Sequence, residues 1–385
     1  MKRTLLVPIL VSAIFPPAGS YAQVPAPAHV VIVMEENHDY AQIIGSAAAP
    51  YINALAGDTH GALFTQSYAL THPSQPNYLM LYSGSNQGVV NDNLPSGLPF
   101  TTPNLGASLM DSGWTFAGYS EDLPYAGFEG TSSGAYARKH NPWANWQSAP
   151  VNGIPVGANL PLTGFPTDLD SLPTVSFVIP NQDNDMHNGS DPATITTGDT
   201  WLRNHLDGYI QWAKTHNSLF VLTFDEGTNS GSNRIVTLFV GSMVRQGAYN
   251  ETINHYSVLR TLENMFGLPH AAGSLTASPI VDCWVSLTDI SGGKGRLPEN
   301  PVLMQNFPNP FNPSTTIPFS IPRSSEITLK VLDVLGREVV VLANEQRPAG
   351  TYTVTWDASH ASSGVYFYRL DAGGYGIVKK LLLLK

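Results

Sequence analysis

The sequence contains one cysteine and few charged side chains. Cys283 is the single cysteine among 385 residues, which excludes an intrachain disulfide framework and a cysteine-rich zinc site. Charged residues make up 12% of the chain, and 29 acidic against 19 basic residues give a formal net charge of -10. This balance argues against nucleic acid as the main partner, because binding a phosphate backbone requires basic surfaces. A small phosphate-bearing substrate remains compatible with it, since a bound cation can reverse the local field.

Beyond its N-terminal segment, the chain also lacks an apolar run long enough to span a bilayer. Residues 1–22 are predicted to be a secretory signal, with Lys2 and Arg3 giving a positive start and residues 5–15 an apolar run. A buried N-terminal helix is the alternative, which the prolines of this segment disfavour. At 42% hydrophobic residues, the rest of the chain can build a sizeable core.

Apolar runs alternate with helical patterns between residues 28 and 290. The runs are continuous, as is typical of strands buried on both faces of a parallel sheet. The predicted strands are 29–34, 114–119, 175–179, 219–224 and 235–240, and the predicted helices are 105–110, 200–215 and 255–266. This order predicts an α/β domain with a mainly parallel sheet flanked by helices. Residues 120–170 lack periodicity, and we expect them to form a long loop region that shapes a substrate pocket.

The composition changes near Ser291. Residues 291–302 are glycine-rich at their start and indicate a linker. From 303 to 385 the pattern becomes short alternating runs separated by turns, which predicts a small C-terminal β-sandwich.

Polar clusters interrupt the α/β pattern, and two of them directly follow predicted strands. The clusters are Glu35 to His38, Thr71 to Tyr78, Asp183 to His187, Asp225-Glu226 and Asn254-His255. Ligands bind at the carboxyl ends of parallel strands, so these groups could converge on one crevice. Taken singly, each has a simpler explanation, since acids also cap helices or occupy turns and histidines also lie on surfaces.

Together the clusters predict metal-assisted chemistry on a phosphoester. Two acidic pairs can hold a divalent cation through oxygen ligands, and without one they would repel each other. His187 and His255 supply imidazole for a transition metal or for proton transfer. Ser74 is a candidate nucleophile that needs activation by a base or a metal, and Asn77 could donate a hydrogen bond to a phosphoryl oxygen.

Several ordered segments resemble the phosphoesterase family, which includes bacterial acid phosphatases and phosphocholine-type phospholipases C within the alkaline-phosphatase-like superfamily. The matching segments are 33–38, 71–78, 225–227 and 254–260. The resemblance spans about residues 28 to 285 and implies an alkaline-phosphatase-like fold and phosphoester hydrolysis.

The same resemblance implies roles for individual residues. The implied metal ligands are Glu36, Asn37, Asp225, Glu226 and the nucleophile Ser74. Residues 74–77 also resemble the threonine-x-proline-asparagine segment of nucleotide pyrophosphatases in this superfamily. By that analogy Asp185, His187 and His255 would form a second metal site, or bind phosphate and donate a proton. The metal could be calcium, magnesium, zinc or manganese.

Two departures from related patterns matter. Many relatives carry Asp-His after the second acidic pair where this chain has Ser232-Asn233, which leaves the number of metals open. Sulfatases need an arginine after the nucleophile that residues 74–77 lack, so sulfate esters are disfavoured. Three functions stay open: a phosphomonoesterase, a phosphodiesterase or phospholipase C, and a surface binding protein on a decayed hydrolase scaffold.

The C-terminal region resembles a type IX secretion sorting domain over residues 303 to 385. The segments that carry the resemblance are 305–313, 331–337 and 364–368. It implies export by the type IX machinery to a secreted or surface-attached location. An accessory β domain without a targeting role is the alternative.

Overall fold

The computed structural model describes residues 24–229, 231–285, 300–304, 306, 309 and 311–384. The predicted signal segment 1–22, residues 286–290 of the predicted catalytic domain, most of the predicted linker and much of the stretch 305–310 lie outside the described residues. Among the described residues, no helix is both long and apolar enough to cross a bilayer.

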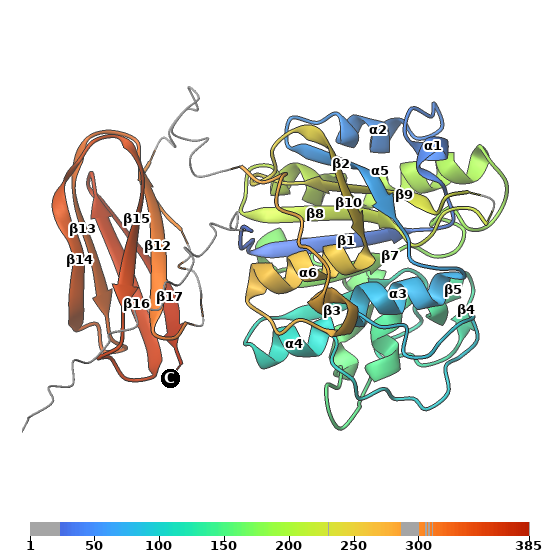
Figure 1. Cartoon of the computed structure of the whole chain (residues 1–385), viewed down its shortest axis with the longest axis horizontal. Helices are drawn as coiled ribbons and strands as arrows, with labels where there is room; N and C mark the ends of the chain where they lie inside the picture. The colour runs from blue at the N-terminus through green and yellow to red at the C-terminus, as the bar shows by residue number, and fades with distance from the viewer. Residues whose placement is uncertain are drawn as a thin grey trace, which may run out of the picture.

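An eight-stranded sheet forms the centre of the first unit, in the order β10-β2-β9-β8-β1-β7-β3-β6 (Figure 1). The strands are β1 (His29–Glu35), β2 (Gly61–Tyr68), β3 (Phe116–Ser120), β6 (Asn159–Pro161), β7 (Val175–Ile179), β8 (Ser218–Phe224), β9 (Arg234–Val240) and β10 (Gly247–Asn254). Strand β9 is antiparallel to both neighbours, and the other neighbouring pairs are parallel. The prediction of a mainly parallel sheet is therefore confirmed.

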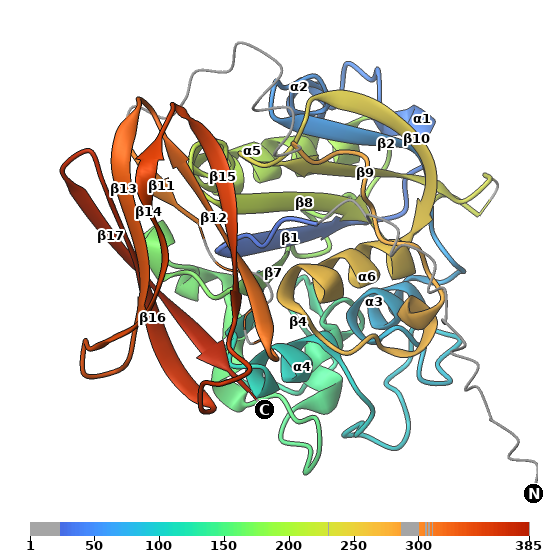
Figure 2. The same ribbon diagram turned by 60° about the vertical axis from the view of Figure 1, so that its left-hand side comes forward.

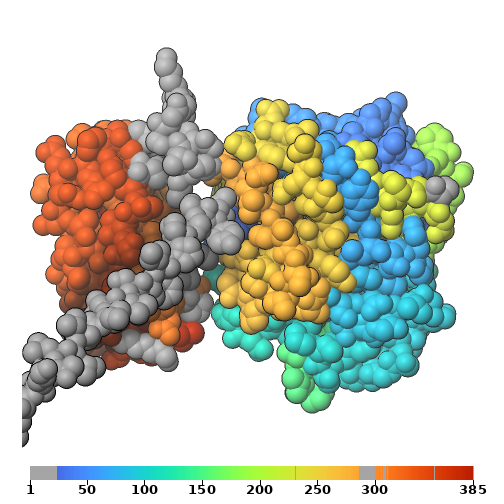
Figure 3. Space-filling view, viewed as in Figure 1, coloured from blue at the N-terminus to red at the C-terminus, as the bar shows by residue number. Residues whose placement is uncertain are grey.

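Helices cover both faces of this sheet (Figure 2). One face carries α3 (Ser74–Ser83), α4 (Leu105–Asp111) and α6 (His255–Phe266), and the other carries α2 (Pro50–Ala56) and α5 (Ala193–Ala213). The short α1 (Tyr40–Ile43) follows β1, and a two-stranded hairpin joins β4 (Ser132–Ser133) to β5 (Tyr136–Ala137). Helices α3 and α6, far apart in sequence, pack against each other on the same face of the sheet. Every residue of α3 is buried, so this helix contributes little of the surface that Figure 3 shows.

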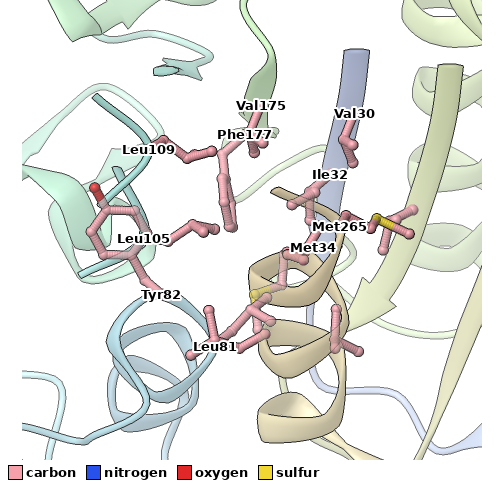
Figure 4. Close-up of a cluster of buried hydrophobic side chains, with 14 of the residues drawn as sticks. Val30, Ile32, Met34, Leu81, Tyr82, Leu105, Leu109, Val175, Phe177 and Met265 are labelled. Atoms are coloured by element: carbon pink, nitrogen blue, oxygen red, sulfur yellow. The ribbon is translucent and has the colours of Figure 1, made fainter. Parts of the chain in front are cut away.

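Side chains of β1 alternate between two apolar cores, as the pleat of a strand requires. Val30, Ile32 and Met34 point toward α3 and α6, where they pack with Leu81 and Met265 (Figure 4). The intervening valines of the strand pack toward α5. A strand buried on both faces explains why the sequence shows a continuous apolar run rather than alternation.

Four elements illustrate how the structure differs from expectation. Helix α5 begins at Ala193 rather than near 200, because the threonines of its first turns hide the apolar stripe. Helix α3 begins at Ser74 where the sequence shows Pro76, a residue that the first turn of a helix tolerates. Strands β2 and β10 have mixed polar and apolar sequences and carried no predicted strand signal.

The C-terminal unit consists of two antiparallel sheets, in the orders β11-β12-β15 and β14-β13-β16-β17. The strands are β11 (Val302–Leu303), β12 (Ser314–Ile321), β13 (Ser325–Leu332), β14 (Glu338–Arg347), β15 (Gly350–Asp357), β16 (Gly364–Ala372) and β17 (Tyr375–Leu383). Inward side chains of both sheets, such as Phe319 and Leu329, share one apolar core. The predicted β-sandwich is confirmed.

Candidate active site

Three neighbouring parallel strands bring the acidic clusters to one edge of the sheet. Strand β1 lies between β7 and β8, and Glu35 is paired in register with Phe224, so Glu36 follows β1 beside the residue that follows β8. The Glu36 backbone N–H donates to the Asp185 carbonyl at 2.8 Å. The Asn37 backbone N–H donates to Asp225 Oδ1 at 3.1 Å, because Asn37 adopts a left-handed conformation with φ of 50°.

Ser74 lies where the sequence predicted, against the carboxylates. It begins α3, and its hydroxyl, in a residue only 2% exposed, donates to Glu36 Oε2 at 3.0 Å. The Ser74 hydroxyl also opposes the rise in the pKa of the neighbouring buried Asp225. One turn later on the same helix face, the Tyr78 hydroxyl donates to Glu36 Oε1 at 2.5 Å. Helix α3 thus presents two hydroxyls to the carboxylate that follows β1.

Asn77 forms hydrogen bonds with the backbone of the loop that precedes Ser74 in the chain. Its buried Oδ1 accepts hydrogen bonds from the backbone N–H groups of Leu70 and Thr71, each at 3.2 Å. Its Nδ2 donates to the Thr71 carbonyl at 2.9 Å and to Glu226 Oε2 at 3.3 Å. A hydrogen bond from Asn77 to substrate stays a prediction, and it would require Nδ2 to give up Glu226.

The acidic pair after β8 is buried and short of donors. Burial, followed by the charge of Glu36, raises the pKa of Asp225 well above its usual range, and the same two causes raise the pKa of Glu226 to about 8. Asp225 Oδ2 has no hydrogen-bond partner among the described residues. His72 Nδ1 lies 3.0 Å from Glu226 Oε2. Buried carboxylates in this state need either protons or a cation.

His140, which the sequence did not single out, joins the acids that follow β1 and β7. Its Nε2 lies 3.2 Å from Glu36 Oε1 and its Nδ1 lies 3.2 Å from Asp185 Oδ2. Its ring stacks on Tyr78 with centroids 5.0 Å apart. Burial lowers the pKa of His140 to about 4, so the ring is neutral near pH 7 and can donate to one carboxylate only. The contact with the other carboxylate needs a proton or a cation, and burial raises the pKa of Asp185 to about 7.

The place of His140 in the fold explains why it was missed. It ends the 3₁₀ helix η1 (Arg138–His140), in the region without periodicity, where only the two-residue strand β5 precedes it and no apolar run marks its position. One local feature could have indicated that this part of the loop is buried. The segment η2 (Pro142–Trp146), which follows shortly after His140, carries two tryptophans that are fully buried and anchor the loop.

His255 and His187 occupy different settings. His255 begins α6 in a residue only 1% exposed, and its Nε2 donates to the Asp225 carbonyl at 2.7 Å. Burial lowers the pKa of His255 to about 4, and its Nδ1 has no partner among the described residues. A free buried lone pair favours a ligand role for His255 over a proton-donor role. His187 is half-buried, and its backbone N–H donates to Asp185 Oδ1 at 2.9 Å.

The predicted second metal set of Asp185, His187 and His255 is not the set that the fold gathers. Within the described part of the chain, the group whose ligand atoms all lie within 4.8 Å of one another is Glu36, His140 and Asp185. Asp185, which follows β7, contacts His140. His255 instead donates a hydrogen bond to the carbonyl of Asp225, which follows β8 on the other side of β1. Unpaired buried oxygens and a free imidazole nitrogen fit a divalent cation.

Comparison with known families gives two matches. The sequence profile of the phosphoesterase family matches residues 47–269, and that of the secretion system C-terminal sorting domain matches residues 305–384.

Two curated relatives illustrate the first match. A phosphatidylinositol-3-phosphatase of Mycobacterium tuberculosis is 49% identical over 262 residues, covering 68% of this chain and 84% of that protein. An acid phosphatase of Aspergillus fumigatus is 34% identical over 249 residues, covering 61% of this chain and 54% of the fungal protein. The chain therefore spans about half the length of the fungal relative.

Solved structures are more distant. A phosphonate monoester hydrolase of Agrobacterium radiobacter gives a TM-score of 0.43 at 12% identity, covering 92% of this chain and 88% of that one. A murine ectonucleotide pyrophosphatase/phosphodiesterase 5 gives a TM-score of 0.43 at 10% identity, covering 67% and 100%. At these values neither structure establishes fold or function.

Proposed function

This chain belongs to the phosphoesterase family and is a phosphoric ester hydrolase, and from that premise we propose a secreted, metal-dependent phosphomonoesterase that uses Ser74 as its nucleophile. The observation that carries the proposal is the hydrogen bond from the buried Ser74 hydroxyl to Glu36. Both curated relatives are named phosphatases, which supports a monoester over a diester substrate.

The residues proposed to hold the metal are the set predicted from the sequence together with His140, which the sequence did not single out. They are Glu36, Asn37, Ser74, Asp225, Glu226 and His255, with Asp185 and His140 alongside Glu36. When bound, a divalent cation would neutralise charge on the phosphoryl oxygens and acidify the Ser74 hydroxyl.

The chemistry of the chain's own groups follows from their contacts. Ser74 Oγ attacks phosphorus in line, and its proton passes to the Glu36 carboxylate that already accepts it. The ester oxygen leaves as an alcohol after taking a proton from the half-buried His187, which acts in its protonated form, while His140 stays between the two acids as a neutral ring. Water then attacks the phosphoserine and gives a proton to His187, while Ser74 Oγ leaves phosphorus and takes back the proton held by Glu36, which releases phosphate.

A comparison of two serines on α3 tests this assignment. Ser74→Ala should lower kcat on p-nitrophenyl phosphate by at least about 1,000-fold, because covalent catalysis is lost. Ser83→Ala, a buried serine at the other end of the helix, is the matched control and should keep turnover within about threefold. Full activity of Ser74→Ala would reject Ser74 as the nucleophile.

Metal dependence is tested on the same purified protein. Dialysis against a chelator should abolish turnover, and return of calcium, magnesium, zinc or manganese in separate samples identifies the ion that restores it. Undiminished turnover by protein shown to be metal-free would contradict this part of the proposal.

We also propose that residues 1–22 direct the chain to the periplasm and that the C-terminal sandwich delivers it to the type IX machinery, for release or attachment at the cell surface. The match of the sorting-domain profile to residues 305–384 supports this route.

A further inference from the structure

Lys139 places a positive charge at the edge of the acidic site. Its Nζ lies 3.1 Å from Asp92 Oδ2 and 3.4 Å from His187 Nε2. The side chain is 16% exposed, and the next residue is His140. Burial raises the pKa values of Asp185 and Glu226, and the Lys139 charge opposes that rise at both residues. The ammonium group therefore acts on acids that belong to opposite sides of the site.

Gln75, the residue after the nucleophile, holds Asp92 in place through hydrogen bonds to the loop of residues 91–93. Gln75, which follows Ser74 and is 2% exposed, donates its backbone N–H to Asp92 Oδ1 at 3.0 Å. Its Nε2 donates to the Asn91 carbonyl at 3.1 Å and to the Asn93 carbonyl at 2.9 Å. Three hydrogen bonds from one residue thus hold the loop, and with it Asp92 and Lys139, at a set position relative to Ser74.

The geometry leaves a donor for a ligand. An ammonium group has three N–H donors: Asp92 accepts from one, and His187 Nε2 accepts from at most one more, in the state in which that nitrogen carries no proton. A phosphomonoester enters a site crowded with carboxylates as a dianion, and needs positive charge beyond that of the cation. Lysine binds phosphate as a point charge through charge-assisted hydrogen bonds.

We propose that Lys139 is a substrate-binding residue that holds a phosphoryl oxygen of a dianionic monoester, and that Asp92 and Gln75 position its ammonium group. The proposal rests on the proposed function. It predicts that Lys139 favours monoesters over diesters, because a diester carries one negative charge fewer.

The test compares lysine variants on two substrates and one inhibitor. Lys139→Met and Lys139→Gln, each loaded with metal, should raise KM for p-nitrophenyl phosphate and the inhibition constant of inorganic phosphate by about 10- to 100-fold. The kcat should change by less than about threefold, since the contact is made in ground and transition states alike. The KM for bis(p-nitrophenyl) phosphate should rise less than that of the monoester, and Lys139→Arg should restore part of the loss.

Lys214→Met is the matched control. Lys214 is 13% exposed and pairs with Asp58, but it follows α5 at the opposite edge of the sheet, so its loss should leave both constants unchanged. Glutamine keeps a polar contact with Asp92 if the methionine variant folds poorly.

Unchanged KM and unchanged phosphate inhibition in a folded Lys139 variant would overturn the proposal, as would an equal loss on monoester and diester. The Ser74→Ala result separates this outcome from failure of the proposed function. An inactive Ser74→Ala enzyme with normal phosphate inhibition in Lys139→Met rejects Lys139 alone. An active Ser74→Ala enzyme with weakened phosphate inhibition in Lys139→Met rejects the nucleophile alone.

Discussion

His140 lies between the buried carboxylates of Glu36 and Asp185 and contacts both. Its ring nitrogens face Glu36 and Asp185, each at 3.2 Å, and its removal would leave those carboxylates facing each other. We expect His140→Ala to lower kcat/KM on p-nitrophenyl phosphate by about 100-fold or more, with weaker metal retention.

The control is His216→Ala. His216 also stacks on an aromatic ring, Trp212, with an interplanar angle of 12°, but it is exposed and precedes β8 at the far edge of the sheet. Metal content and steady-state kinetics of the two variants decide the matter. An equal loss of metal and of kcat/KM in both variants would show that ring stacking, rather than contact with the acids, is what matters.

Strand β3 supports the loop that carries His140. A Cβ added at Gly118 would lie 2.0 Å from the ring of Trp143, the residue that anchors η2. Gly118→Ala should therefore destabilise the protein by about 1–3 kcal/mol and lower activity through the displaced loop. In contrast, Gly208 in α5 has nothing within 4 Å of its added Cβ. Gly208→Ala should stabilise the protein by about 0.5–1 kcal/mol in urea unfolding. A Gly118→Ala protein as stable as the parent would contradict this packing.

Helix α6 and the turn after it are joined by a buried carboxyl with a pH-dependent effect. Burial raises the pKa of Glu263 to about 7, although its oxygens accept hydrogen bonds from Ala271 N and Ser274 Oγ at 2.8 and 2.6 Å. The folded state holds this proton more tightly than the unfolded state. The stabilisation is thus present below the ordinary pKa of glutamate and is lost as the pH rises through about 7.

Glu263→Gln keeps an acceptor for Ala271 and carries no titrating group. The Tm of the variant relative to the parent should therefore increase from pH 5 to pH 8, by the equivalent of roughly 1 kcal/mol. Scanning calorimetry at both values checks this. A difference in Tm that stays constant or falls with pH would show that Glu263 is ionised in the folded protein throughout the range.

The whole molecule consists of two separately cored units. The core residues of the sandwich all come from residue 303 onward, and those of the sheet unit end at Trp284. A chain ending after residue 285 should therefore fold and keep kcat/KM on p-nitrophenyl phosphate within about twofold of the full chain. In a host with a type IX system it should fail to reach the cell surface. An inactive but folded truncated protein would show that the sandwich contributes to catalysis.

The sequence by itself determined the mainly parallel sheet, the separate sandwich and the approach of Ser74 to Glu36 and Asp225. Continuous apolar runs identify strands buried on both faces, and residues that follow adjacent parallel strands must meet at one edge. Only the tertiary structure decided the roles of His140 and Lys139 and the contact between Gln75 and Asp92. These groups sit on loops without periodicity, and loops are placed by packing against the whole domain rather than by local sequence. The same holds for His255, whose assignment depends on a hydrogen bond to a carbonyl 30 residues away.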